Sequence, residues 1–151
     1  MFNIVLWQPE IPPNTGNLMR LTVNTGCRLH LIEPLGFEMQ DARLRRAGLD
    51  YREFADVAMY ASFQEFIETH RPERVYAFTH HATQLYTEIS YRQGDVLLFG
   101  RESDGLPADI LESEGVTGCV RIPIAEGGRS LNLANAAAIA IYEAWRQNGF
   151  A

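Results

Sequence analysis

The sequence contains no lysine: all 13 of its permanently basic side chains are arginine. Arginine carries a planar guanidinium whose paired donors suit phosphate groups, so nucleic acid remains among the candidate partners. The net charge of −6 argues against a general nucleic-acid coat, because such proteins are usually basic. Any phosphate backbone would therefore have to bind to a local basic patch.

Cysteine and long apolar runs are also scarce. The sequence has only two cysteines, Cys27 and Cys119, and they are far apart, which argues against a disulfide framework. The longest apolar run, from Leu133 to Tyr142, is broken by Asn135 and is too short to cross a membrane. The N-terminus lacks the basic segment and cleavage site of a signal peptide and instead has the pattern of a strand. We expect a cytoplasmic protein without membrane contact.

The motifs of several common sites are missing as well. The sequence has no G-x-G-x-x-G after a strand and no G-x-x-x-x-G-K-[ST], so the two commonest kinds of nucleotide site are unsupported. H-E-x-x-H and G-x-S-x-G are absent too. His80 and His81 are adjacent, and adjacent side chains on a strand or a helix point apart. We therefore predict no metal site.

The 151 residues, 46% of them hydrophobic and 21% charged, predict a single globular domain over residues 1–151. Strands are predicted at residues 2–7, 29–33, 75–79, 95–99 and 118–122. Helices are predicted at residues 14–25, 41–47, 62–70, 107–113 and 132–147. This alternation predicts an α/β fold with a mostly parallel sheet flanked by helices, and ligands beyond the carboxyl ends of the strands.

Cap residues mark the ends of two of these helices. Asn14 is the expected N-cap of the first helix, and Gly26 fits the position just after its end. Asn132 is the expected N-cap of the last helix. That last helix is apolar nearly all round, so we expect it to be buried, in part against another subunit.

Four arginines cluster between the second and third predicted strands: Arg43, Arg45, Arg46 and Arg52. One interpretation is a solvated helix face with ion pairs to Asp41 and Glu53. The other is a local patch that holds a phosphate backbone. The charge pattern alone favours neither.

Three loops combine glycine with polar residues at the edges of predicted elements. They read Asn14-x-Gly16-x-x-x-Arg20, then Phe99-Gly100-x-Glu102-x-x-Gly105-Leu106, then Arg129-Ser130-Leu131-Asn132-Leu133-Ala134. Each loop by itself also fits a capped helix or an ordinary connection. Together, in this order and at these spacings, they carry a specific signal.

With these motifs the chain resembles the SPOUT class of RNA methyltransferases, in its branch of ribose 2′-O-methyltransferases. The resemblance covers essentially the whole chain, with one departure: Ala134 stands where the family often has serine. The short length and the stretch at residues 43–51 are similar to the members that methylate the wobble nucleotide, position 34, of bacterial tRNA.

The resemblance implies a fold, a donor and an assembly. The fold would be a parallel-sheet α/β domain with a deep C-terminal trefoil knot, which is a rare exception to the rule against threaded chains. S-adenosylmethionine would bind in the knot, and two copies would form a homodimer through the C-terminal helix. The donor-binding residues carried over by position are Phe78, Gly100, Glu102, Ile122, Ser130 and Leu131.

The resemblance also assigns catalysis to Arg20. A guanidinium stays protonated in proteins and is a poor base, so we expect Arg20 to clamp a phosphate and stabilise the developing alkoxide. The residues expected to contact tRNA are Asn14, Arg43, Arg45, Arg46 and Asn132. Glu102 has a second interpretation, in which it braces its own loop.

The expected reaction is 2′-O-methylation of the ribose at the wobble nucleotide of tRNA, with leucine tRNAs as the first candidates. The catalytic loops would look the same in an enzyme that modifies another tRNA position or rRNA. From a different class, a non-catalytic module that binds a nucleotide and dimerises remains an alternative.

Overall fold

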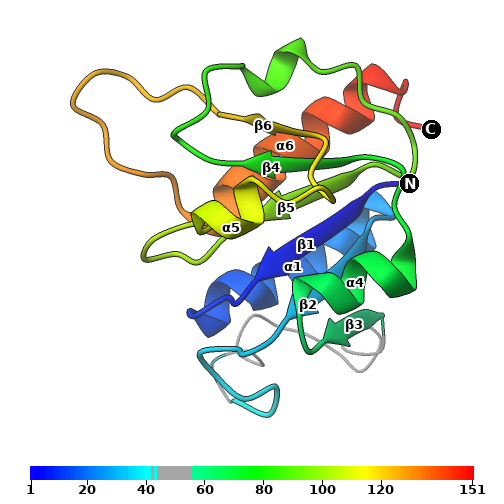
Figure 1. Cartoon of the computed structure of the whole chain (residues 1–151), viewed down its shortest axis with the longest axis vertical. Coiled ribbons are helices and arrows are strands. Elements are labelled where there is room, and N and C mark those ends of the chain that lie inside the picture. The colour runs from blue at the N-terminus through cyan, green and yellow to red at the C-terminus, as the bar shows by residue number, and fades with distance from the viewer. Residues whose placement is uncertain (42, 44–55) are drawn as a thin grey trace.

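The computed structural model describes residues 1–41, 43 and 56–151. In this part of the chain the named strands form one sheet in the order β3-β2-β1-β5-β4-β6, and neighbouring strands pair in parallel (Figure 1). The strands are β1 Asn3–Trp7, β2 Arg28–Ile32, β3 Val57–Tyr60, β4 Val75–Phe78, β5 Val96–Phe99 and β6 Gly118–Val120. The predicted mostly parallel α/β architecture is confirmed.

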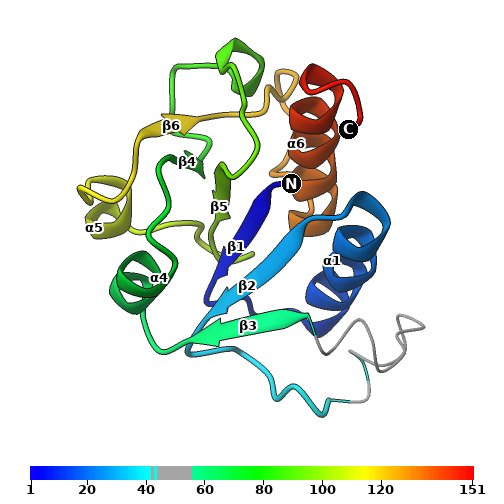
Figure 2. The same ribbon diagram turned by 90° about the vertical axis from the view of Figure 1, so that its right-hand side faces the viewer.

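Helices cover both faces of the sheet. They are α1 Pro12–Thr25, α4 Phe63–His70, α5 Ala108–Leu111 and α6 Leu133–Gln147, with a 3₁₀ turn, η1, at Tyr86–Glu88. Viewed along the sheet edge, α1 and α6 lie on one face, and α4 and α5 lie on the other (Figure 2). Each face carries its own buried apolar cluster.

The central strand β1 supplies both clusters because successive side chains of a strand point to opposite faces. Ile4 and Leu6 pack in the cluster under α1 and α6, whereas Val5 and Trp7 pack in the cluster under α4 and α5. Burial on both faces explains why the sequence of β1 is a continuous apolar run.

Two expected caps are present and one is not. Gly26 follows α1 with φ of 70°, and the side chain of Asn132 accepts a hydrogen bond from the backbone N–H of Asn135 at 3.2 Å. Asn14, however, is not an N-cap: α1 begins at Pro12, and Ile11 is its N-cap. Proline suits the first helical turn because its missing N–H has no helical partner there, so the helix starts earlier than predicted.

Strand β3 was not predicted from the sequence. It is a four-residue strand at the sheet edge that pairs only with β2 among the described strands. A run this short has too little periodicity to identify it, and the pairing with β2 decides its conformation. The predicted helix at residues 41–47 lies almost wholly outside the described residues.

Helix α6 is buried on one side only. Ala137, Ala140 and Ala144 are fully buried against the sheet and α1, whereas Ile139 and Tyr142 are 38% and 45% exposed. The expectation that a second subunit covers this helix stays a prediction. No helix in the described ranges is long and apolar enough to cross a membrane.

Candidate active site

A cavity of about 480 Å³ opens beyond the carboxyl ends of β4 and β5. Its wall is formed by residues 78–81 after β4, residues 99–106 after β5, and residues 130–133 at the start of α6, with Ile122 and Asn14 among the others. This volume is in the range of ligand pockets, and this edge of a parallel sheet is where such folds bind ligands.

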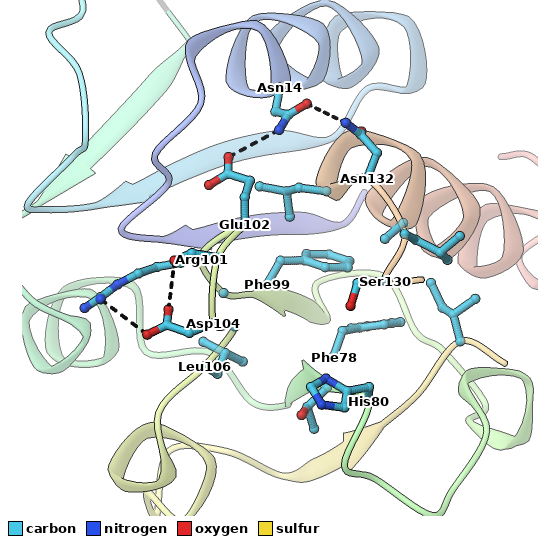
Figure 3. Close-up of a pocket in the computed structure, with 18 of the residues that line it drawn as sticks. Asn14, Phe78, His80, Phe99, Arg101, Glu102, Asp104, Leu106, Ser130 and Asn132 are labelled. Carbon is cyan, nitrogen blue, oxygen red and sulfur yellow. Dashed lines mark hydrogen bonds and ion pairs between the residues drawn. The ribbon is translucent and has the colours of Figure 1, made fainter. Parts of the chain in front are cut away.

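The cavity contains every residue that the resemblance assigns to the donor. Phe78, Gly100, Glu102, Ile122, Ser130 and Leu131 all line it, although they are separated by up to 53 residues in the sequence. The structure therefore brings together the six positions, and it adds Asn14 and Asn132 to the same wall. Figure 3 shows the lining side chains grouped around this space, among them the labelled Asn14, Phe78, Glu102, Ser130 and Asn132.

Two aromatic rings form an apolar surface inside the cavity. The rings of Phe78 and Phe99 stack with their centroids 4.6 Å apart and their planes 22° apart. Gly100 follows directly, and a Cβ there would lie 2.2 Å from the carbonyl carbon of Gly105. Only glycine therefore permits this turn, which leaves the backbone of residue 100 at the wall of the cavity. Apolar surface with nearby backbone donors and acceptors suits an adenine ring.

Asn14 connects all three sequence motifs (Figure 3). Its Nδ2 donates to Glu102 Oε1 at 3.4 Å, and its Oδ1 accepts from Asn132 Nδ2 at 2.8 Å. A carboxylate only accepts, so Glu102 dictates which way the Asn14 amide faces. Asn14 is 5% exposed, and its place inside the first turn of α1 explains why it does not act as a cap.

The carboxylate of Glu102 accepts hydrogen bonds mainly from backbone N–H groups of the segment before α1. Its Oε2 accepts from the N–H of Glu10 at 2.7 Å, and its Oε1 accepts from the N–H of Ile11 at 3.2 Å. These bonds satisfy N–H groups at the start of α1, which no helical carbonyl can reach. The geometry favours the interpretation in which Glu102 braces the loop.

Further contacts between the same two segments were missed by the sequence analysis. Arg101 donates to Gln8, and Ser103 donates to Glu10. The side-chain hydrogen bond from Ser103 is the main cause that lowers the pKa of Glu10. Positions 101 and 103 are open in the second motif, so the motif gave no signal for them.

Arg20 does not line this cavity. It lies on α1 with an exposed side chain, six residues beyond Asn14. Its expected role in clamping a phosphate therefore stays a prediction. Of the expected basic patch, Arg43 is exposed and pairs with Asp41 at 3.0 Å, while Arg45, Arg46 and Arg52 lie outside the described residues.

The described cysteines and histidines do not form an evident nucleophile or metal site. Burial raises the pKa of both Cys27 and Cys119, which disfavours a thiolate nucleophile. His80 and His81 line the cavity with their ring centroids 3.9 Å apart. Within the described residues no group of three histidine, cysteine or acidic side chains is placed to hold a metal ion.

Comparisons with known proteins agree with the motifs. The family model described as SpoU rRNA Methylase family matches residues 1–142. A protein of Saccharophagus degradans, named tRNA (cytidine(34)-2'-O)-methyltransferase, is 56% identical over 151 residues, covering 100% of this chain and 98% of its own. The resemblance drawn from the three motifs is confirmed.

Solved structures show the same fold. One, reported for the 2-OH methylation of C/U34 on tRNA, has a TM-score of 0.91 and 45% identity, covering 99% of this chain and 97% of its own. Another is an AdoMet-bound rRNA methyltransferase from Sinorhizobium meliloti, with a TM-score of 0.82 and 29% identity, covering 96% of this chain and 56% of its own.

Proposed function

Because this chain belongs to the SpoU rRNA Methylase family, we propose that it methylates the ribose 2′-hydroxyl of nucleotide 34 of tRNA, with S-adenosylmethionine as the donor. One observation carries the proposal: three segments far apart in the sequence line one cavity and are joined there by Asn14, Glu102 and Asn132. The full-length relative named for cytidine 34 supports the position. Leucine tRNAs are the first candidate substrates.

The chemistry of the lining residues suits the donor. The stacked Phe78 and Phe99 offer an apolar face to adenine, and the backbone of Gly100 and Ile122 offers hydrogen bonds beside it. Ser130 and Leu131 close the side next to α6. When bound, S-adenosylmethionine supplies a methyl group on a sulfonium, which is already a good leaving group.

The acceptor hydroxyl must lose its proton and lie in line with the methyl group, about 3–3.5 Å away. Arg20 clamps a phosphate beside the target ribose and stabilises the developing alkoxide, while phosphate or water takes the proton. Asn14 and Asn132 each retain one amide N–H beyond the bonds described above, and we assign these donors to the RNA.

A homodimer reconciles this role with the position of Arg20 outside its own cavity. Helix α6 packs beside α1, and the exposed Ile139, Tyr142 and Val23 supply apolar surface on these two helices (Figure 2). Two copies joined through α6 bury this surface and bring Arg20 of one protomer to the cavity of its partner.

The rest of the proposal follows the family. After β6 at the sheet edge the chain leads to α6, which packs on α1 and β5. The proposed fold carries a C-terminal knot that holds the donor. The arginines at positions 43, 45 and 46 bind the tRNA backbone, and the protein acts in the cytoplasm, where tRNA is found.

The test is transfer of labelled methyl from S-adenosylmethionine to unmodified leucine-tRNA transcripts, with the labelled nucleotide mapped. A matched transcript carries a 2′-deoxy sugar at nucleotide 34. Label at that nucleotide, lost with the deoxy sugar, establishes the atom and the position. Label elsewhere or on rRNA assigns a different RNA site, and tight donor binding without transfer to any RNA supports a binding module instead.

A further inference from the structure

The turn after β5 forms side-chain hydrogen bonds with the segment that follows β1. Arg101 Nε and Nη2 both donate to Gln8 Oε1, with Nε at 3.1 Å, and the guanidinium lies 4.6 Å from the centroid of the Trp7 ring. Two residues on, the backbone N–H and hydroxyl of Ser103 donate to Glu10 Oε1 at 3.0 and 2.6 Å. We call these contacts, Arg101 on Gln8 and Trp7 and Ser103 on Glu10, the clasp.

Both sides of the clasp have a fixed backbone. The turn is tight because residues 101 and 105 exchange backbone hydrogen bonds at 3.3 and 3.0 Å. On the other side, Gln8 has φ of 52°, in the left-handed region that is strained for a non-glycine residue. The two hydrogen bonds from Arg101 to one oxygen atom therefore hold the side chain of Gln8, whose backbone is strained.

The clasp holds the wall of the cavity that the proposed function assigns to RNA. In Figure 3 Arg101 points away from Phe78 and His80, so its guanidinium is directed away from the aromatic surface proposed for adenine. The segment that it holds continues into Ile11 and Asn14, which form the wall of the cavity, and then into α1. A shift of this segment would move Asn14 while leaving the Phe78–Phe99 stack in place.

We propose that Arg101, acting through Gln8, is a positioning residue for methyl transfer: it holds the wall that carries Asn14 in the geometry that receives the target nucleotide. The inference rests on the proposed function, because it assigns this wall to RNA. Arg101 lines the cavity, but its guanidinium is engaged by Gln8, Trp7 and Asp104 and points away from the aromatic pair, so we assign it no contact with the reacting atoms. It acts through the path of the chain into α1.

The test is a double-mutant cycle of Arg101→Ala, Gln8→Ala and their combination, with kcat/KM for tRNA and the Kd for S-adenosylhomocysteine measured for each. Misplacement by about 1 Å can cost on the order of 100-fold in rate, so each single variant should lose roughly 10- to 100-fold in kcat/KM. The double variant should lose no more than either single one. Donor-site Kd should change by less than about threefold, because the aromatic surface is untouched.

Two further variants separate positioning from charge and from folding. Arg101→Lys should not restore activity, because an ammonium lacks both the paired donors and the flat face. Arg71→Ala is the matched control: this exposed arginine also donates a hydrogen bond, to Glu68 O at 3.3 Å, and should retain the wild-type rate. Melting temperatures of all variants confirm that each is folded at the assay temperature.

Additive losses in the double variant, full activity in Arg101→Ala, or an equal loss of S-adenosylhomocysteine affinity would each overturn the inference. If the wild-type protein labels no tRNA at nucleotide 34, the proposed function fails by itself. Amide exchange then reads the clasp separately, at the N–H groups of Glu10 and Ile11 that donate to Glu102. If these N–H groups exchange faster in Arg101→Ala and Gln8→Ala, and no faster still in the double variant, the clasp is supported. Exchange rates equal to those of the wild type overturn it.

Discussion

The side-chain amide of Asn132 donates a 2.8 Å hydrogen bond to Asn14, a residue 118 positions earlier in the chain. The same Asn132 caps α6 through its Oδ1. One residue therefore serves two structural purposes, and the two can be separated by substitution.

Asn132→Asp should keep the cap and lose the cross-link, because a carboxylate accepts from Asn135 N–H but cannot donate to Asn14. We expect its free energy of unfolding to fall by no more than about 1 kcal/mol, with a much larger relative loss of methyl transfer. Asn132→Ala loses both contacts and should be the less stable. Equal transfer rates in Asn132→Asp and the wild type would show that the cross-link is dispensable.

Glu102→Gln tests whether Glu102 braces the loop or holds the donor. Its carboxylate accepts from the N–H groups of Glu10 and Ile11, so an amide in its place turns a donor toward one of them. We expect unfolding to become easier by about 1–3 kcal/mol in denaturant titration. Calorimetry should find donor affinity within about threefold of wild type, since these bonds are to the loop. A large loss of affinity at unchanged stability would return Glu102 to the donor site.

Arg20→Ala should reduce turnover by on the order of 100-fold and leave donor affinity unchanged, because in the proposed mechanism Arg20 stabilises charge that develops in the transition state. Arg20→Lys should recover only part of the rate, since lysine lacks the paired donors for phosphate. The measurement is single-turnover methyl transfer with saturating tRNA. Near wild-type rates in both variants would remove Arg20 from catalysis.

The arginine patch makes a prediction about salt. Replacing Arg45 and Arg46 together with glutamine should weaken tRNA binding and reduce the slope of log K against log salt by about 1–2, as each lost phosphate contact lowers it by nearly one. Donor binding should stay the same. An unchanged slope would favour the alternative, in which these arginines belong to a solvated face.

His30 predicts how stability depends on pH. It is fully buried, with Nδ1 3.1 Å from the Tyr60 hydroxyl and Nε2 3.0 Å from Asn3 Oδ1, and burial is the main cause that lowers its pKa to about 3. Below the ordinary pKa of about 6.5 the unfolded chain takes up a proton that the folded chain does not. Stability is therefore fully present above that value and is lost as the pH falls toward 3.

His30→Gln keeps an amide that can bond to the same partners and removes the titration. Between pH 7.5 and 5.0 the wild type should lose about 2 kcal/mol more unfolding free energy than this variant. His70, whose pKa burial also lowers, is present in both proteins and so cancels in the difference. Parallel pH profiles would show that His30 does not carry this effect.

The α/β class and most of the elements could be predicted from the amino-acid sequence. The apolar runs of β1 and β5 and the amphipathic pattern of α4 follow from which faces are buried, so local composition records them. The residues around the cavity were also identifiable, because motif spacing and family resemblance together single out positions such as Gly100 and Ser130.

The contacts between those residues could not be predicted in the same way, because they depend on the folded chain. The start of α1 at Pro12, the bracing of its first N–H groups by Glu102, and the clasp from Arg101 to Gln8 all depend on contacts between segments about 90 residues apart. Local sequence patterns hold no information on such pairings, because they form when the neighbouring parallel strands β1 and β5 bring their carboxyl ends together. The sequence identifies the residues of the site, and the pairing of the strands determines which of them come into contact.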